Sequence, residues 1–382
     1  MDRHVIKGRG ENRDKYLAAL FRRGEGRQKE AMMKTQLVTI PSIKDPIKKS
    51  PGFEKKELAD YKLDIMGKCG FSCSYCSTAA TTFVRVNRER WADEAERQLG
   101  ERLYPNAPHL SLRWGDFEER LDAQLATKPA ASAGVRAGDF WGHGHTLVFS
   151  QLTDAFSPWA VADGLTERTL DKVLRRTGFR IRVLTKSAIV GTDRWIKLFQ
   201  GWPGRFIVGL SIGTLDDGWA RRVEIGTSSP TARVKALHRL QDAGVPTFGM
   251  LCPIFPDALN GEGVERLVEA IRPELCETVW SEPYNDRANW RAVAAGYADE
   301  RSRAFIARMF SGDEARLTWS QYAGHLYDRV HAALRARGAE QKHRYLLYQG
   351  SLVDFERERL RGAEGVLFQS AEKPKALPMV SP

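Results

Sequence analysis

Three cysteines of this 382-residue chain fall within a stretch of eight residues. Cys69, Cys73 and Cys76 are spaced as Cys-x3-Cys-x2-Cys on a segment that also contains glycine and serine. A structural zinc ion needs a fourth ligand, and the sequence has no second Cys-x2-Cys or closely paired histidines to supply it. Three thiolates can instead hold a [4Fe-4S] cluster and leave one iron open to an outside ligand. An open iron is a position where reactive chemistry can be built.

The other residues that bind metals give weaker signals. His143 and His145 form a Gly-His-Gly-His run, but nothing in the sequence fixes them beside the cysteines. Cys252 and Cys276 fall on predicted strands, where we expect buried core residues. Five cysteines are too few for a disulfide scaffold. The clustered thiols are therefore the predicted metal ligands.

Alternating strands and helices must position these thiols. Tyr61 to Met66 alternates as a strand that ends at Gly67, so the cysteines follow a strand. A strand at 83–86 and a helix at 88–99 are expected next. Further strands are predicted at 145–151, 180–184, 206–212, 245–254 and 276–281, with helices at 166–176, 193–200, 229–243 and 263–271. Repeated βα units with short connections predict a parallel sheet covered by helices, either as a closed or as an open barrel.

The composition and the local sequence patterns suggest that the chain has four parts. We expect a basic, loosely packed N-terminal extension over 1–60, a core over 61–285 with an insertion at about 100–144, a mainly helical extension over 286–371, and a flexible tail over 372–382. The composition is 42% hydrophobic and 28% charged, as in folded proteins. No run approaches the ~18 apolar residues that span a bilayer, so we expect a cytoplasmic protein without a membrane partner, acting as a monomer.

The thiol spacing, the strand before it and the βα series after it resemble those of radical S-adenosylmethionine (radical SAM) enzymes, as does Tyr75 just before the last cysteine. The resemblance implies an α/β fold, a partial (β/α)6 barrel. It also implies that the open iron of a [4Fe-4S] cluster chelates S-adenosylmethionine. One electron, from a donor such as flavodoxin or ferredoxin, would then yield methionine and a 5′-deoxyadenosyl radical that abstracts hydrogen from a substrate.

A finer resemblance covers about residues 49–285 and points to the spore photoproduct lyase-like branch, sometimes described as relatives of DNA-repair photolyases. The motifs that agree in order are Thr153-Asp154, Thr185-Lys186-Ser187, Leu210-Ser211-Ile212, Glu224, and Ser229-Pro230 before a helix containing Arg233. The matched positions imply that Lys186 and Ser211 contact the carboxylate of S-adenosylmethionine. Thr153 and Asp154 would contact its amine or ribose, and Tyr75 its adenine.

Each of these residues also has a structural interpretation. Lys186 could be a surface lysine, and Ser211 a strand hydroxyl bonded to backbone. Thr153-Asp154 could cap a helix, and Tyr75 could pack under the loop. Glu224 could bind ribose or pair with Arg221 or Arg222.

The sequence departs from the lyase at one position. The lyase has a hydrogen-donating cysteine just before the motif matched by Thr153-Asp154, where this chain has Leu152 preceded by Gln151. The resemblance therefore does not imply repair of thymine dimers by the same hydrogen return. Cys252, Tyr345 and Tyr348 are other candidate donors, although buried packing roles are favoured for all three.

The sequence does not identify the substrate. A net charge of +11 and the branch resemblance favour nucleic acid, and hence DNA repair. Modification of a peptide or a small metabolite is the alternative for an enzyme. A non-catalytic metal or iron–sulfur module that binds nucleic acid through its basic surface is the alternative from another class.

Overall fold

The protein was analysed as a computed structural model, which describes residues 36–41, 45–78, 81–129, 137–150, 152–286 and 288–369. Within these residues the main sheet has nine strands in the order β12-β11-β10-β9-β8-β7-β6-β3-β2. Neighbours from β3 to β12 pair in parallel, and β2 pairs antiparallel with β3. The strands are β2 Ile47–Lys49, β3 Tyr61–Leu63, β6 Thr146–Phe149, β7 Arg180–Thr185, β8 Phe206–Leu210, β9 Thr247–Ile254, β10 Cys276–Pro283, β11 His343–Tyr348 and β12 Val366–Gln369.

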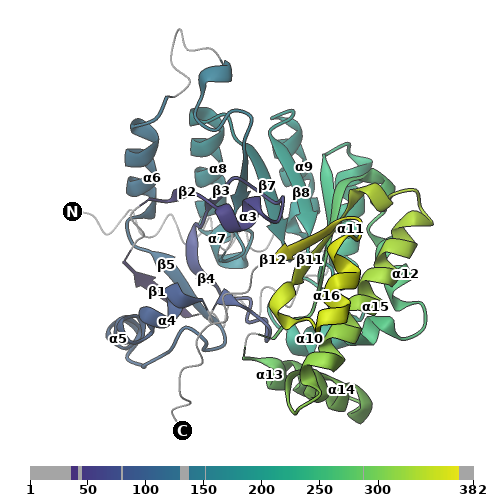
Figure 1. The fold of residues 1–382 in the computed structure, drawn as a ribbon. Helices are drawn as coiled ribbons and strands as arrows, with labels where there is room; N and C mark the ends of the chain where they lie inside the picture. The colour runs from purple at the N-terminus through teal and green to yellow at the C-terminus, as the bar shows by residue number, and fades with distance from the viewer. Residues whose placement is uncertain are drawn as a thin grey trace.

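Helices form the crossovers between the parallel strands from β6 to β12, and others lie in the N-terminal part of the chain. The helices are α3 Pro51–Glu54, α4 Thr82–Val86, α5 Arg88–Leu99, α6 Phe117–Ala126, α7 Pro158–Ala162, α8 Leu165–Arg176, α9 Asp193–Gln200, α10 Asp217–Val223, α11 Pro230–Asp242, α12 Gly263–Ala270, α13 Trp290–Ala295, α14 Glu300–Phe310, α15 Ala315–Arg335 and α16 Asp354–Arg361. Figure 1 shows the sheet flanked by helices, with α15 and α16 beside β11 and β12. The predicted α/β fold is confirmed: β3 and β6 to β10 form the βα series, and β11 and β12 extend it.

The two faces of the main sheet pack against different partners. On the outer face, alternate strand residues such as Ile181 and Val183 belong to the large core shared with the helices. The inner face carries a second core cluster of Leu58, Ile207, Phe248, Met250, Cys252, Trp280 and Leu346. Leu58 enters this cluster from the segment after α3, and Trp280 Nε1 donates to the carbonyl of Lys56 at 2.9 Å. The N-terminal segment therefore packs onto the inner face.

A second, three-stranded sheet has the order β1-β5-β4 and consists of β1 Gln36–Ile40, β5 Leu110–Trp114 and β4 Met66–Cys69. β5 pairs in parallel with β1 and antiparallel with β4, whose last residue is the first cysteine of the cluster. Figure 1 shows this sheet apart from β7 and β8 of the main sheet. It supports the start of the cysteine segment.

Two expectations differ from the structure, and a third gains detail. Residues 36–60 are not loosely packed where described, because Val38 and Ile40 are buried in β1. The predicted strand at 83–86 is wrong: these residues lie in α4, whose first turn is capped by the Thr81 hydroxyl. So short an apolar run does not distinguish a strand from a helix. The stretch at 100–144 supplies β5 and α6.

The proposed domain limits remain predictions. Residues 1–35 of the predicted N-terminal extension and the predicted tail at 372–382 lie outside the described residues. In the described part of the chain, no helix combines the length and the apolar character needed to cross a bilayer.

Candidate functional site

The cysteine loop, residues 69–78, is held on two sides. On one side it pairs with the end of α10: the Ser74 N–H donates to the Val223 carbonyl at 2.8 Å, and Cys73 forms an isolated antiparallel bridge with Glu224. The Gly226 N–H donates to the Phe71 carbonyl at 2.9 Å. A Cβ at Gly226 would lie 3.0 Å from that carbonyl oxygen, so glycine permits the close approach.

On its other side the loop contacts the segment after β6. The Thr78 hydroxyl donates to the carbonyl of Leu152, and the Leu152 N–H donates to the carboxylate of Asp64 at 2.6 Å. The cysteine loop is therefore fixed between the segments that follow β6 and α10. A loop held in this way presents its thiols in a defined region of the molecule.

The three thiols are free and half-buried. Burial raises the pKa of Cys69 to about 11, opposed by backbone N–H groups of Phe71 and Asp154 that bond its sulfur. Burial and the charge of Glu224 raise the pKa of Cys73 well above its usual range. Across the described residues, no three His, Cys, Asp or Glu side chains are arranged to hold a metal ion. By their chemistry, three soft thiols on one loop are nevertheless the donor set of a cluster ligated by three cysteines, and backbone N–H groups bond the sulfur of the first.

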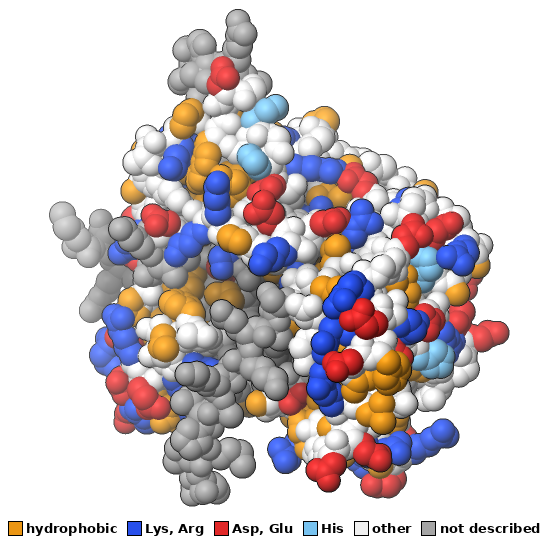
Figure 2. Space-filling model, in the orientation of Figure 1, with side chains coloured by type: hydrophobic (Ala, Val, Ile, Leu, Met, Phe, Trp, Pro, Cys, Tyr) orange, Lys and Arg blue, Asp and Glu red, His pale blue; other side chains and the backbone are white. Residues whose placement is uncertain are grey.

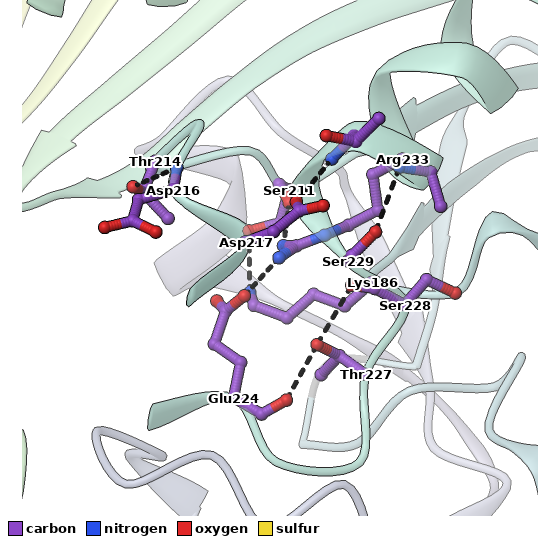
Figure 3. A network of polar contacts seen from close by, with 12 residues as sticks. Lys186, Ser211, Thr214, Asp216, Asp217, Glu224, Thr227, Ser228, Ser229 and Arg233 are labelled. Atoms are coloured by element: carbon purple, nitrogen blue, oxygen red, sulfur yellow. Dashed lines mark hydrogen bonds and ion pairs between the residues drawn. The ribbon is translucent and has the colours of Figure 1, made fainter. Parts of the chain in front are cut away.

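Behind the loop lies a buried ion pair between Glu224 and Arg233, whose side chains are 3% and 1% exposed (Figure 3). Arg233 also donates to the Ser211 carbonyl at 2.5 Å, and the Tyr75 hydroxyl donates to Glu224. Burial acts to raise the pKa of Glu224, but the charges of Arg233 and Lys186 hold it below its ordinary value. The interpretation in which Glu224 pairs with Arg221 or Arg222 is wrong: Ser229 caps α11 and places Arg233 in its first turns, facing inward.

Lys186 and Ser211 lie together at the ends of β7 and β8. The Lys186 ammonium donates to the Ser211 hydroxyl at 2.6 Å, and that hydroxyl donates to the Cys252 carbonyl at 2.7 Å. The Lys186 nitrogen is 5.5 Å from the centroid of the Tyr75 ring. Lys186 is therefore directed into the network of Figure 3 rather than away from it, and two of its three N–H donors are not used by Ser211.

Asp154 and Thr153 have different surroundings. The Asp154 carboxylate accepts from the Thr185 hydroxyl at 2.7 and 2.9 Å, the Lys186 N–H at 2.7 Å and the Phe156 N–H at 2.9 Å. It therefore ties the loop after β6 to the end of β7. The Thr153 hydroxyl is buried without a hydrogen-bond partner among the described residues. Of the two side chains, Thr153 has the unused polar group.

The structure gathers the predicted site residues at one edge of the sheet. The cysteine loop, Tyr75, Thr153, Asp154, Lys186 and Ser211 all lie near the carboxyl ends of β6, β7 and β8. The histidine run is elsewhere: His145 precedes β6, with Nδ1 3.5 Å from Asp60. Tyr345 is fully buried and donates to the Ala323 carbonyl at 2.6 Å, as a packing tyrosine would.

Sequence reasoning missed the role of Arg233 as the partner of Glu224. The available signal was the Ser229-Pro230 cap, which sets the first turn of α11 and hence the direction of Arg233. Glu224 and Arg233 are nine positions apart, and this spacing indicates no contact within a single helix or strand. The pair itself could therefore not be predicted from the sequence.

Comparison with known structures defines the class of fold. A cysteine-to-serine mutant of spore photoproduct lyase matches with a TM-score of 0.51 at 15% identity, covering 83% of each chain. A tyrosine-to-phenylalanine mutant of the same lyase matches with a TM-score of 0.50, again at 15% identity and 83% of each chain. The chain is therefore related in fold to spore photoproduct lyase.

Two curated proteins match part of the chain. An uncharacterized protein of Acidianus two-tailed virus is 24% identical over 156 residues, 41% of this chain and 50% of the relative. An uncharacterized protein of Methanocaldococcus jannaschii is 27% identical over 127 residues, 33% of this chain and 46% of the relative. The chain spans about half the length of the curated relatives it matches. No family model matches the sequence.

Proposed function

We propose that this chain is a radical SAM enzyme of the spore photoproduct lyase-like kind, with Cys69, Cys73 and Cys76 as ligands of a [4Fe-4S] cluster. One observation carries the proposal: a fixed three-thiol loop lies beside Lys186 and the Thr153 hydroxyl at the carboxyl edge of a parallel sheet, and this hydroxyl has no hydrogen-bond partner among the described residues. Ligands of open α/β sheets bind at this edge. The fold shared with spore photoproduct lyase supports the same assignment.

When bound, the cluster and S-adenosylmethionine supply reductive cleavage of the sulfonium and hydrogen abstraction from a substrate. The residues of the chain orient the cofactor. Lys186 attracts its carboxylate, and Ser211 fixes the direction of the lysine ammonium. The Thr153 hydroxyl accepts a hydrogen bond from its amine or ribose. Tyr75 would lie beside its adenine, while Asp154 positions the strand ends on which these groups stand.

The proposed substrate is nucleic acid, acted on in a repair-like reaction. The net charge of +11 supports an anionic substrate, and the fold neighbour is named for a lyase that acts on a photoproduct. An electron donor such as flavodoxin or ferredoxin, a cytoplasmic location and a monomeric state complete the proposal.

Anaerobic reconstitution with iron and sulfide, followed by dithionite and S-adenosylmethionine, tests the proposal. We expect 5′-deoxyadenosine, measured by chromatography. Cys73→Ala should lose both the cluster absorbance and the product. The matched control is Cys276→Ala, because Cys276 is a buried thiol at the start of β10 that lies 3.5 Å from the Ile271 carbonyl.

Two results would contradict the proposal. A wild-type protein with a full cluster that forms no 5′-deoxyadenosine would refute radical SAM activity. A Cys73→Ala protein that retains an intact cluster would refute the ligand assignment and leave the activity to be explained by other ligands.

A further inference from the structure

The inner face of the main sheet changes from apolar to polar toward its carboxyl edge. Because side chains alternate along a strand, residues i and i+2 share a face. One level of the inner face is apolar, with Leu184, Met250, Trp280 and Leu346 in or against the second core cluster. Two positions further along the chain stand Lys186, just past the end of β7, and Cys252, Glu282 and Tyr348 on the other three strands. The apolar level is thus followed by a level of polar side chains, Lys186, Cys252, Glu282 and Tyr348, called the polar row below.

The polar row has two ends. At β7 and β8, Lys186 and Ser211 contact each other and belong to the proposed cofactor site. At β10 and β11, Glu282 and Tyr348 are half-buried and have no part in that site. Cys252 lies between the ends, close enough to Lys186 on one side and Lys56 on the other that both charges act on its pKa, which burial raises.

Lys56 reaches the second end of the row from the segment after α3. Its ammonium lies 3.4 Å from the Tyr348 hydroxyl, 5.7 Å from the centroid of the Tyr348 ring and 5.9 Å from that of Phe53. The bond from Trp280 to its carbonyl fixes the backbone at this residue. Burial acts to lower the pKa of Lys56, but the charge of Glu282 and the contact with Tyr348 hold it above its ordinary value.

This lysine therefore keeps its charge on the inner face. Among the described residues, Glu282 is the carboxylate whose charge acts on this ammonium, while the direct contact of the ammonium is with the Tyr348 hydroxyl. A charged amine with two aromatic neighbours suits a ligand in which an oxyanion is joined to a planar ring. Aromatic side chains stack on any nucleobase, and a nearby cation takes the phosphate. A simple carboxylate would use the lysine but not the rings.

We propose that Lys56, flanked by Phe53 and Tyr348, binds a phosphate of a nucleotide unit of the substrate at the carboxyl ends of β10 and β11. The site adjoins the proposed cofactor residues through Cys252. The inference rests on the proposed function for the reaction that follows binding, but binding itself is measured separately.

The test is the binding of fluorescently labelled tetrathymidylate to cluster-loaded protein, followed by anisotropy over a range of salt concentrations. Lys56→Met should weaken binding about tenfold and reduce the salt slope by about 0.7, the value for one phosphate contact in a single strand. The matched control is Lys55→Met, because Lys55 is its exposed neighbour in the sequence and should change binding less than about twofold. Lys56→Arg keeps the charge and should restore most of the affinity.

The outcomes separate this inference from the proposed function. Equal losses in Lys56→Met and Lys55→Met, or no binding by the wild type at low salt, would overturn the inference. Binding of an acidic peptide but not of tetrathymidylate through Lys56 would overturn the nucleotide part of the inference.

Wild-type protein that forms 5′-deoxyadenosine without binding tetrathymidylate overturns the inference and leaves the proposed function standing. Wild-type protein that binds tetrathymidylate through Lys56 but forms no 5′-deoxyadenosine overturns the proposed function alone. If Lys56→Met does not fold, Lys56→Gln takes its place, with the same expected losses of affinity and of salt slope.

Discussion

Glu224 joins three parts of the site through one residue. Its backbone bridges Cys73, and its carboxylate accepts from Tyr75 and pairs with Arg233. A buried carboxylate without a cation is costly, because the lost hydration is not replaced. Arg233 therefore stabilises the buried Glu224 carboxylate that contacts the cysteine loop through Tyr75.

Replacing Arg233 by methionine tests this dependence. Arg233→Met should lower the free energy of unfolding by about 3–5 kcal/mol at pH 7, because it leaves the Glu224 charge buried and unpaired. The double variant Glu224→Gln/Arg233→Met should recover part of the loss, since it buries no charge. Urea unfolding of the cluster-free protein measures both. A double variant no more stable than the single one would contradict the explanation.

The pH dependence of the same pair has a defined sign. The folded pKa of Glu224 lies below its ordinary value of 4.5, so the stability it contributes is present above that pH and is lost as pH falls through the folded pKa. In Arg233→Met the carboxyl can take up a proton and become neutral. The difference in stability between wild type and variant should therefore narrow below pH 4.5.

At the scale of elements, the short segment 223–226 determines where the cysteine loop lies. Gly226→Val should displace this segment, because a Cβ already meets the Phe71 backbone at 3.0 to 3.3 Å. We expect iron to be lost to a chelator several times faster in this variant, with the secondary structure unchanged by circular dichroism. Gly362→Ala is the control, since a Cβ there has no neighbour within 4 Å. Equal rates of iron loss in the two variants would show that the segment does not position the loop.

Elements with local periodicity could be predicted from the sequence. The helix expected at 193–200 has the observed bounds, because Trp195 and Phe199 mark its buried face. The sheet β1-β5-β4 could not be predicted, since it joins strands far apart in the chain and β4 has only four residues. At the site, the thiols are recognisable from their spacing. The buried contact of Asp154 with Thr185 depends on tertiary packing and leaves no pattern.

At the scale of the whole molecule, two stacked histidines join the C-terminal elements to the sheet. His343 is fully buried, with Nε2 2.7 Å from the Ser281 hydroxyl and Nδ1 3.4 Å from Nδ1 of His331. His331 in turn contacts Arg335 and lies 3.8 Å from Glu364. Burial, helped by the charges of His331 and Arg344, lowers the pKa of His343 to about 3.

This lowered pKa predicts acid sensitivity of the fold. Between pH 6.5 and about 3 the unfolded chain takes up a proton at His343 that the folded chain does not, so stability falls as pH falls. The slope from this residue approaches about 1.4 kcal/mol per pH unit. His343→Gln should lose that slope. Urea unfolding at several pH values measures it, and parallel curves for the two proteins would contradict the assignment.

Positive and negative side chains are mixed on the surface over α15 and α16 in Figure 2. Over α15 and α16, Lys and Arg side chains stand next to Asp and Glu side chains. Arg357 pairs with Asp354 at 3.0 Å, and Arg361 with Glu358 at 2.8 Å. Mixed charges of this kind give no strong field of one sign. The surface over α15 and α16 is therefore a poor candidate for nucleic acid.

The strand order also bears on synthesis at the ribosome. From β6 to β12 each new strand pairs with the one made just before it, so the main sheet can grow in the order of translation. The cysteine loop cannot follow this order, because β5 comes after it and its partner segment 223–226 emerges only after β8. The three thiols of a nascent chain thus leave the ribosome well before the contacts that enclose them. Until those contacts form, the thiols are open to the reductants and iron carriers of the cell.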